Sequence, residues 1–216
     1  MSIGAILTKE IKTDVRNPYT LAGSLLFLLS SLFVCYITIK RISAPGTWTS
    51  LFWIILLFTS FNAVAKSFVN ETRERMLYLY TIVSPMDFIV SKMLYNAMVM
   101  VTLSIVAVTI FSTLFEITIE DPIAFWFGVI LGAAGFAIVL SLLSTIASKA
   151  GNNLTLMAIL GLPILLPMIL VTTAITKNAI DGIDWAVQWK YAFVLVGLNV
   201  VCFALSVILF PYLWRE

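Results

Sequence analysis

The stretch of this sequence with the most chemistry to offer is a charged and aromatic segment between two long apolar runs. Glu71 and Arg75 lie four residues apart, which supports a helix, and the side chains beside them are methionine, leucine and tyrosine. Aromatic and methionine side chains beside arginine are typical of protein–protein contacts. We therefore expect this segment to dock a partner protein, the alternative being a solvated loop whose apolar residues touch the membrane interface. The residues expected to dock the partner are Glu71, Arg73, Glu74, Arg75, Met76, Leu77, Tyr78, Tyr80 and Ser84.

The end of the segment carries the signals of a new helix. Ser84 is a suitable N-cap, Pro85 fits the first turn, and Asp87 lies where the positive end of a helix favours an acid. The chain is thus predicted to leave one apolar run, form a short charged helix and restart.

Several kinds of chemistry are disfavoured by what the chain lacks. It has no histidine, and the interiors of its expected spans carry no charged residue. Ion-coupled transporters usually place ionisable groups within the membrane, and no phosphate-binding loop for ATP is present. An intramembrane enzyme is disfavoured for the same reasons, and energy for uphill transport would have to enter through another chain. Cys35 and Cys202 are expected to be buried thiols rather than a disulfide.

The elements that must position the charged segment are long apolar helices. Of the 216 residues 61% are hydrophobic and 11% charged, whereas a soluble domain carries roughly 25% charged residues. The apolar runs are continuous and long enough to cross a bilayer as helices. We expect an all-α membrane protein with a single transmembrane permease domain over residues 1–216. The six predicted spans are 19–39, 48–65, 93–115, 123–147, 154–175 and 191–213.

The first 17 residues predict an amphipathic helix in the membrane interface, with its cations near lipid phosphates. Glu10 and Asp14 interrupt the stretch, so it is not expected to be a cleavable signal peptide. Its apolar residues recur at helical spacing: Ile3, Ile6, Leu7, Ile11 and Val15.

Basic residues predict the orientation of the chain. With the N-terminus inside, nine of the 13 Lys and Arg residues fall in cytoplasmic segments, which favours two cytoplasmic termini. The segment 66–92 is then a cytoplasmic coupling segment, and 177–190 is an external loop. A net charge of +2 is too small to indicate a nucleic-acid partner.

Glycine, proline and tryptophan mark special positions in the spans. Gly161, Pro163 and Pro167 predict a kinked or broken helix, which would either line a substrate path or fit a neighbouring helix. Gly128 and Gly132, followed by Gly135, predict close helix packing. The six tryptophans are expected to be mostly interfacial anchors near span ends: Trp48, Trp53, Trp126, Trp185, Trp189 and Trp214.

Blocks spread over nearly the whole chain resemble heme exporter protein B (CcmB), the membrane subunit of the cytochrome c maturation transporter. They are the opening Lys9–Lys12 helix ending at Arg16-Asn17-Pro18, the loop from Phe68 to Leu77, Ser84-Pro85, Ser91-Lys92, and the Lys149–Asn153 turn that precedes Leu154 to Pro167.

The resemblance implies an ABC-type permease of the bacterial cytoplasmic (inner) membrane, with a coupling helix after the second span. A separate cytoplasmic ATP-binding subunit would dock there, so this chain would not itself be an enzyme. Its other partners would be further cytochrome c maturation membrane proteins, the lipid bilayer and a second copy of the chain. Heme is expected at most as a substrate and not as a durably bound cofactor, and the resemblance leaves open whether it passes through this subunit. The chain has no histidine, so axial ligands would have to come from a partner or from weaker Met or Tyr ligands.

Other functions remain open at this stage. They are a permease for a lipid, drug or polysaccharide, a non-transporting membrane assembly scaffold, and a channel or facilitator that needs no ATPase.

Overall fold

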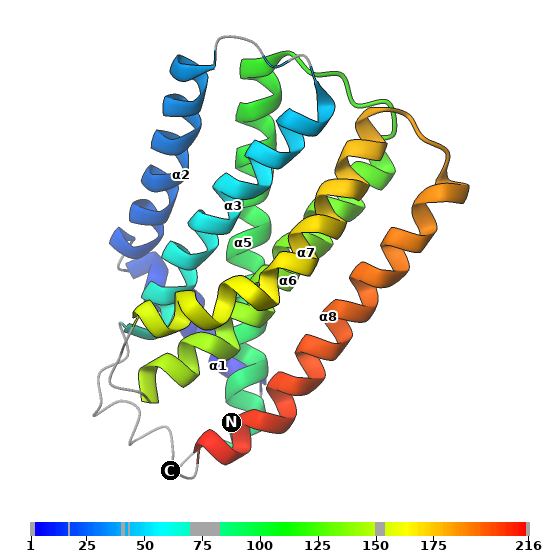
Figure 1. Cartoon of the computed structure of the whole chain (residues 1–216). Helices are drawn as coiled ribbons and strands as arrows, with labels where there is room; N and C mark the ends of the chain where they lie inside the picture. Colours follow the sequence, from blue (N-terminus) through cyan, green and yellow to red (C-terminus); the bar gives the residue numbers. More distant parts are fainter. Residues whose placement is uncertain are drawn as a thin grey trace.

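A computed structural model describes residues 3–16, 18–39, 42, 44–69, 83–149 and 154–214 of the chain. All regular structure in these ranges is helical, and its helices run side by side as a bundle with one helix across its end (Figure 1). The described helices are α1 (Ile3–Arg16), α2 (Tyr19–Thr38), α3 (Pro45–Val69), α5 (Pro85–Phe115), α6 (Pro122–Lys149), α7 (Leu154–Ile180) and α8 (Trp185–Trp214).

Six of the described helices, α2, α3 and α5 to α8, are long and apolar enough to cross a membrane. This confirms the predicted all-α membrane protein. Most helices extend past the predicted spans: α5 begins at Pro85 rather than at residue 93, and the connection between α7 and α8 shrinks to residues 181–184. The prediction ended each span at its charged residues. A helix of 31 residues is about 46 Å long, however, so its polar end turns reach beyond the roughly 30 Å hydrocarbon core.

The centre of the bundle is α6, which packs against α3, α5, α7 and α8. Of its span residues 61% are buried, against 17% in α2 and 22% in α8. The two outer helices therefore present most of their apolar side chains to the lipid, and α6 forms the core with its four neighbours.

Glycines let α6 approach its neighbours closely. A Cβ on Gly128 would lie 2.9 Å from the Ile175 side chain, and one on Gly132 would overlap the Trp53 ring and Thr172. The predicted role of these glycines in close helix packing is confirmed. Gly135 follows the same pattern, since a Cβ there would overlap Met168.

The tryptophan prediction is wrong for two residues. Trp48 and Trp53 are fully buried inside the bundle, whereas Trp185 and Trp189 are 43% and 52% exposed, as interfacial anchors should be. The reason is that α3 packs against α6 and α7. Gly132 makes room for the Trp53 ring, whose indole nitrogen donates a hydrogen bond to Thr176 Oγ1 over 3.0 Å.

Helix α7 is continuous from Leu154 to Ile180, with Pro163 and Pro167 inside it. Figure 1 shows its axis changing direction in its yellow part. Gly161 faces α3, where a Cβ would come within about 3 Å of the Phe61 ring. Helix packing therefore accounts for this glycine, and a role of these three residues in a substrate path stays a prediction.

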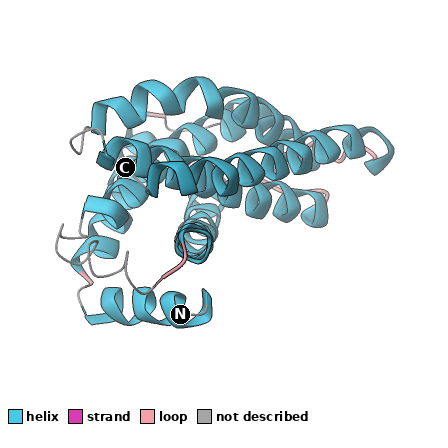
Figure 2. Cartoon of the chain, turned by 90° about the horizontal axis from the view of Figure 1, so that it is seen from below, coloured by secondary structure: helices cyan, strands magenta, loops and turns pink. Residues whose placement is uncertain are grey.

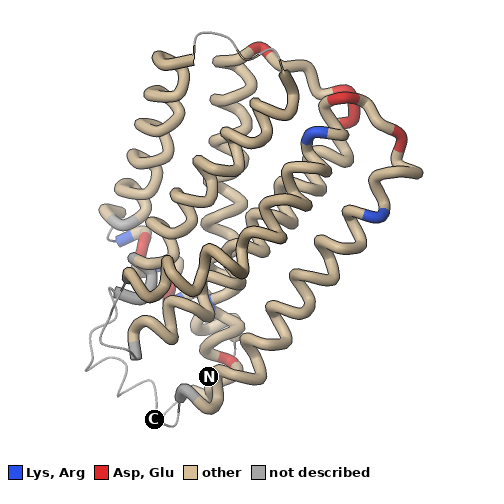
Figure 3. The backbone as a smooth tube through the Cα atoms, viewed as in Figure 1, with Lys and Arg blue, Asp and Glu red and all other residues tan. Residues whose placement is uncertain are grey.

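Both ends of the described chain lie at the same end of the bundle, and α1 runs across that end (Figures 1 and 2). The connections that follow α2, α5 and α7 lie at the opposite end. Acidic residues gather at that opposite end (Figure 3), at the connections that follow α5 and α7: Glu116, Glu120, Asp121, Asp181 and Asp184. The two ends of the bundle therefore differ both in their charged residues and in the chain connections they carry.

Candidate functional site: the junction of α1 with α5

The predicted docking residues between 71 and 80 lie outside the described residues. Helix α3 ends at Val69 and the described chain resumes at Val83, and both residues belong to the end of the bundle where the termini lie (Figure 1). The structure describes the start of α5, which follows that segment in the chain.

The predicted helix start at Ser84 is confirmed. Its backbone is extended, with φ −71° and ψ 145°, and its hydroxyl accepts a hydrogen bond from the Asp87 backbone N–H over 3.2 Å. Pro85 occupies the first turn, where its missing N–H costs nothing. The first turn of α5 is thus fixed by its own cap, immediately after the segment predicted to dock a partner.

The first two turns of α5 are also held from the side, by an apolar cluster with α1 and α8. Ile6 of α1, 1% exposed, enters this cluster, and the Phe88 ring of α5 stacks on the Phe210 ring of α8 at a centroid distance of 5.8 Å. The cluster consists of Ile6, Val83, Phe88, Ile89, Met93 and Phe210. Three helices far apart in sequence therefore meet around the start of α5.

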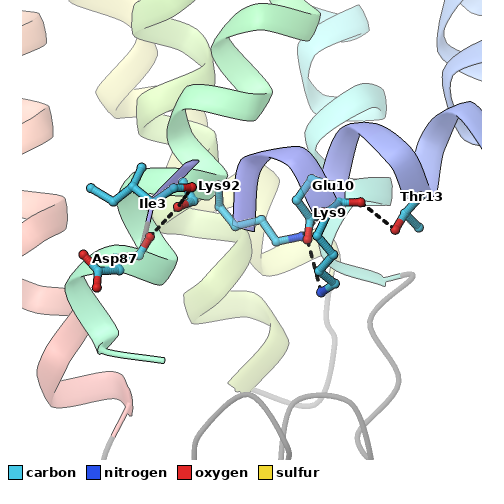
Figure 4. A network of polar contacts seen from close by, with 7 residues as sticks. Ile3, Lys9, Glu10, Thr13, Asp87 and Lys92 are labelled. Atoms are coloured by element: carbon cyan, nitrogen blue, oxygen red, sulfur yellow. Dashed lines mark hydrogen bonds and ion pairs between the residues drawn. The ribbon is translucent and has the colours of Figure 1, made fainter. Parts of the chain in front are cut away.

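An ion pair lies beside this cluster. Lys92 of α5 is fully buried, and its Nζ lies 2.9 Å from Glu10 Oε2 of α1, whose side chain is 12% exposed (Figure 4). Lys9 lies 3.5 Å from the other oxygen of the same carboxylate and is itself 37% exposed. A buried ammonium group costs several kcal/mol unless a carboxylate compensates it. The Glu10 carboxylate therefore compensates the Lys92 ammonium group and links α1 to α5.

Two further polar contacts extend the junction along α1. The Tyr95 hydroxyl donates a hydrogen bond to the Asp14 carboxylate, one turn beyond the ion pair. At the other end, the Ser91 hydroxyl lies 2.6 Å from the Asp87 carbonyl of its own helix and 3.2 Å from the Ile3 carbonyl of α1. The contacts thus run from the first residue of α1 almost to its last turn.

The carboxyl of Asp14 has a raised pKa. Its partial burial chiefly raises its pKa above the usual value of 3.8, the nearby charge of Glu10 raises the pKa further, and Lys92 lowers it. Glu10 and Asp14, four residues apart, share one face of α1, so they repel each other unless the cation of α5 lies between them. The junction therefore places a pair of carboxylates against one cation and one phenol.

This junction was missed by the sequence prediction, which assigned Lys92 to a cytoplasmic loop and used Glu10 and Asp14 only to exclude a signal peptide. A signal was present: Ile6, Glu10 and Asp14 recur every four residues, so they lie on one stripe of α1. Lys92 and Tyr95, three residues apart, form the complementary stripe on α5. Nothing local in the sequence joins the two stripes.

The bundle interior offers packing rather than a polar path. Its centre is filled by mutually contacting rings, with Trp48 stacked on Phe52 at 5.3 Å and close to Phe111 at 4.9 Å. Most buried hydroxyls donate to carbonyls of their own helices, and Asn96 donates to Ser141 over 2.8 Å.

Across the described ranges no group of three His, Cys, Asp or Glu side chains could hold a metal ion. Cys35 and Cys202 are free thiols, as predicted, but both are only half-buried, whereas the sequence predicts that they are buried.

The model of the CcmB protein family matches residues 1–212 of the chain, nearly its full length. The chain belongs to the CcmB family. A comparison with curated proteins gave no match. Together with six apolar helices, membership makes the chain a multi-pass membrane subunit of heme export in cytochrome c maturation.

Proposed function

We propose that this CcmB protein is the permease subunit of an ATP-driven complex that exports heme across the bacterial inner membrane for c-type cytochrome maturation. The observation that carries the proposal is the family match over residues 1–212 of a six-span bundle. ATP is hydrolysed in a separate cytoplasmic subunit, and other cytochrome c maturation membrane proteins receive the heme. Stable axial ligation of heme is left to those partners, since the chain has no histidine.

Charge distribution supports cytoplasmic termini. Among the described residues, the end of the bundle with α1 carries Lys9, Lys12, Arg16 and Lys92, whereas the opposite end carries Lys177 and Lys190 (Figure 3). Basic residues are retained on the cytoplasmic side of membrane proteins. In this orientation the segment between α3 and α5 is cytoplasmic and accessible to an ATPase.

The placement of the charged residues supports a separate ATPase as the source of energy. The charged residues of the described spans lie in their end turns, and Lys92, the deepest one in α5, is already paired with Glu10. A carrier driven by protons or sodium usually exposes an ionisable group to its ion in the middle of the membrane. Binding and hydrolysis of nucleotide on a second chain would supply the work instead.

Docking is tested at residues 71–80. In cells that express the ATPase partner, Met76→Asp, Leu77→Asp and Tyr80→Asp together should abolish co-purification of the ATPase, because each adds a charge to an apolar contact. Insertion into the membrane should be unchanged. The matched control is Ile183→Asp, which adds an exposed charge at the opposite end of the bundle. Unchanged co-purification of the triple variant would remove the docking role from this segment.

A further inference from the structure

Helix α1 makes more contact with the bundle than an interfacial anchor needs. An amphipathic helix binds a membrane surface through an apolar face alone. Here Ile11 and Val15 remain 41% and 74% exposed for that purpose, while Ile6, Glu10 and Asp14 are turned toward α5. Both carboxylates of α1 are used in this contact with α5. The helix is therefore attached to α5 in addition to carrying an exposed apolar face.

The attachment point is the part of α5 that follows the docking segment. Val83, directly after that segment, belongs to the same apolar cluster as Ile6, and Lys92 lies in the second turn of α5. Phe210 brings the end of α8 into the cluster, against Phe88. A displacement of Val83 would therefore act directly on the contacts among α1, α5 and α8.

We propose that α1 is a transmission element: the Glu10–Lys92 ion pair and the Asp14–Tyr95 hydrogen bond fix it to α5, so that both move as one unit when the ATPase acts. This inference rests on the proposed function, because it needs a nucleotide-driven movement to transmit. Glu10, Asp14, Lys92 and Tyr95 are positioning residues, and none of them is expected to touch the substrate.

The geometry favours a rigid attachment over a contact that opens in each cycle. Separating α1 from α5 would leave Lys92, fully buried, without the carboxylate 2.9 Å away. Breaking a buried ion pair by separating its partners strongly destabilises a protein, because a buried charge then loses its compensation. The polar contacts are also spread along α1, so α1 cannot rotate about one of them while the others stay formed.

The test compares the amount of heme exported per ATP hydrolysed in purified complexes that contain this chain and its ATPase, reconstituted into proteoliposomes. Glu10→Gln should leave ATP hydrolysis in place but lower the heme exported per ATP hydrolysed about five-fold or more, the usual size of a lost coupling. The charge swap Glu10→Lys with Lys92→Glu should restore the ratio, which loss of fold could not explain. Lys12→Gln, on the exposed face of the same helix, is the matched control and should change nothing.

A cross-link gives a second, independent readout. In a background with Cys35→Ser and Cys202→Ser, Glu10→Cys and Lys92→Cys can be joined by a short bis-maleimide. A complex locked in this way should keep its export ratio, because α1 and α5 do not separate. Loss of export with continued ATP hydrolysis would overturn the inference.

Failure of this inference differs from failure of the proposed function. If export by the unmodified complex needs nucleotide but Glu10→Gln leaves the ratio unchanged, α1 transmits nothing and the permease assignment stands. If export by the unmodified complex is independent of nucleotide, the proposed function itself fails.

Discussion

The two best-defined regions of this protein are held together by opposite means. Inside the bundle, α3, α5, α6 and α7 interlock through aromatic rings and glycines, as where the Trp53 ring lies over Gly132. At the junction of α1 with α5, the contacts are made by a buried ammonium group, two carboxylates and a phenol. The first region depends on shape and the second on charge.

The difference follows from what each region must do in a membrane. Lipid tails are as apolar as side chains, so spans associate mainly through close packing, for which small residues and flat rings are suited. A helix at the end of the bundle lies beside water and headgroups, where apolar contact alone would let it slide. Charged partners fix its register along α5.

The largest effect is expected where packing is densest. Trp53→Ala removes a fully buried ring and leaves the Thr176 hydroxyl without its donor, so the free energy of unfolding should fall by about 3–5 kcal/mol. Thermal unfolding in detergent measures the change. Trp189→Ala is the matched control, since that side chain is 52% exposed and its loss should have little effect. Equal losses in both variants would contradict the packed interior described for α3 and α6.

The junction should respond next most strongly, and in a way that packing alone does not predict. Lys92→Met removes the nearer of the two cations at Glu10, with Lys9 remaining at 3.5 Å, and should lower stability by about 2 kcal/mol. Adding Glu10→Gln to that variant should recover most of the loss, because the carboxylate that lost its nearer cation is then gone. Lys12→Met on the exposed face is the control. Strictly additive losses from the two substitutions would argue against a direct pair.

A smaller loss is expected from Tyr95→Phe, which removes one hydroxyl and leaves the ring in place. The hydrogen bond to Asp14 is worth about 1.5 kcal/mol, since its acceptor is a carboxylate. Thermal unfolding again provides the measurement, with Tyr191→Phe on the partly exposed surface of α8 as control. No loss in Tyr95→Phe would mean that Asp14 is not held by Tyr95.

The smallest effect is a pH dependence at Asp14. Its pKa in the folded protein is raised above 3.8, chiefly by burial and then by Glu10, so the protonated carboxyl favours folding. That contribution is complete below 3.8 and is lost as the pH rises through the raised pKa. Asp14→Asn has no such loss, so its melting temperature relative to the unmodified chain should increase between about pH 4 and about pH 7. A constant difference across this range would contradict the raised pKa.

The contrast between the two regions also explains which features could be predicted from sequence. Continuous apolar runs predict the six spans, and the small-residue spacing at Gly128 and Gly132 predicts close packing, because both patterns are local. The interior position of Trp48 and Trp53 depends on which helix lies opposite α3, which no local pattern contains. The same holds for Lys92 and Glu10, which are 82 residues apart in the chain.

The candidate docking residues stay a prediction, because residues 71–80 lie outside the described ranges. The docking role of Ser84 stays a prediction too, but its role as helix cap is confirmed: a cap depends only on its own turn, so the pattern of Ser, Pro and Asp was sufficient to predict it. Local chemistry could thus be predicted, and long-range charge pairing could not.

The measurement that tests the account most directly is the nucleotide dependence of heme export. This chain, reconstituted into liposomes with and without its ATPase, would be assayed for heme delivered to the outer side. We predict export only when the ATPase and hydrolysable ATP are both present, and none with a non-hydrolysable analogue. Uphill export by this chain alone would contradict the claim that its energy arrives through a second protein.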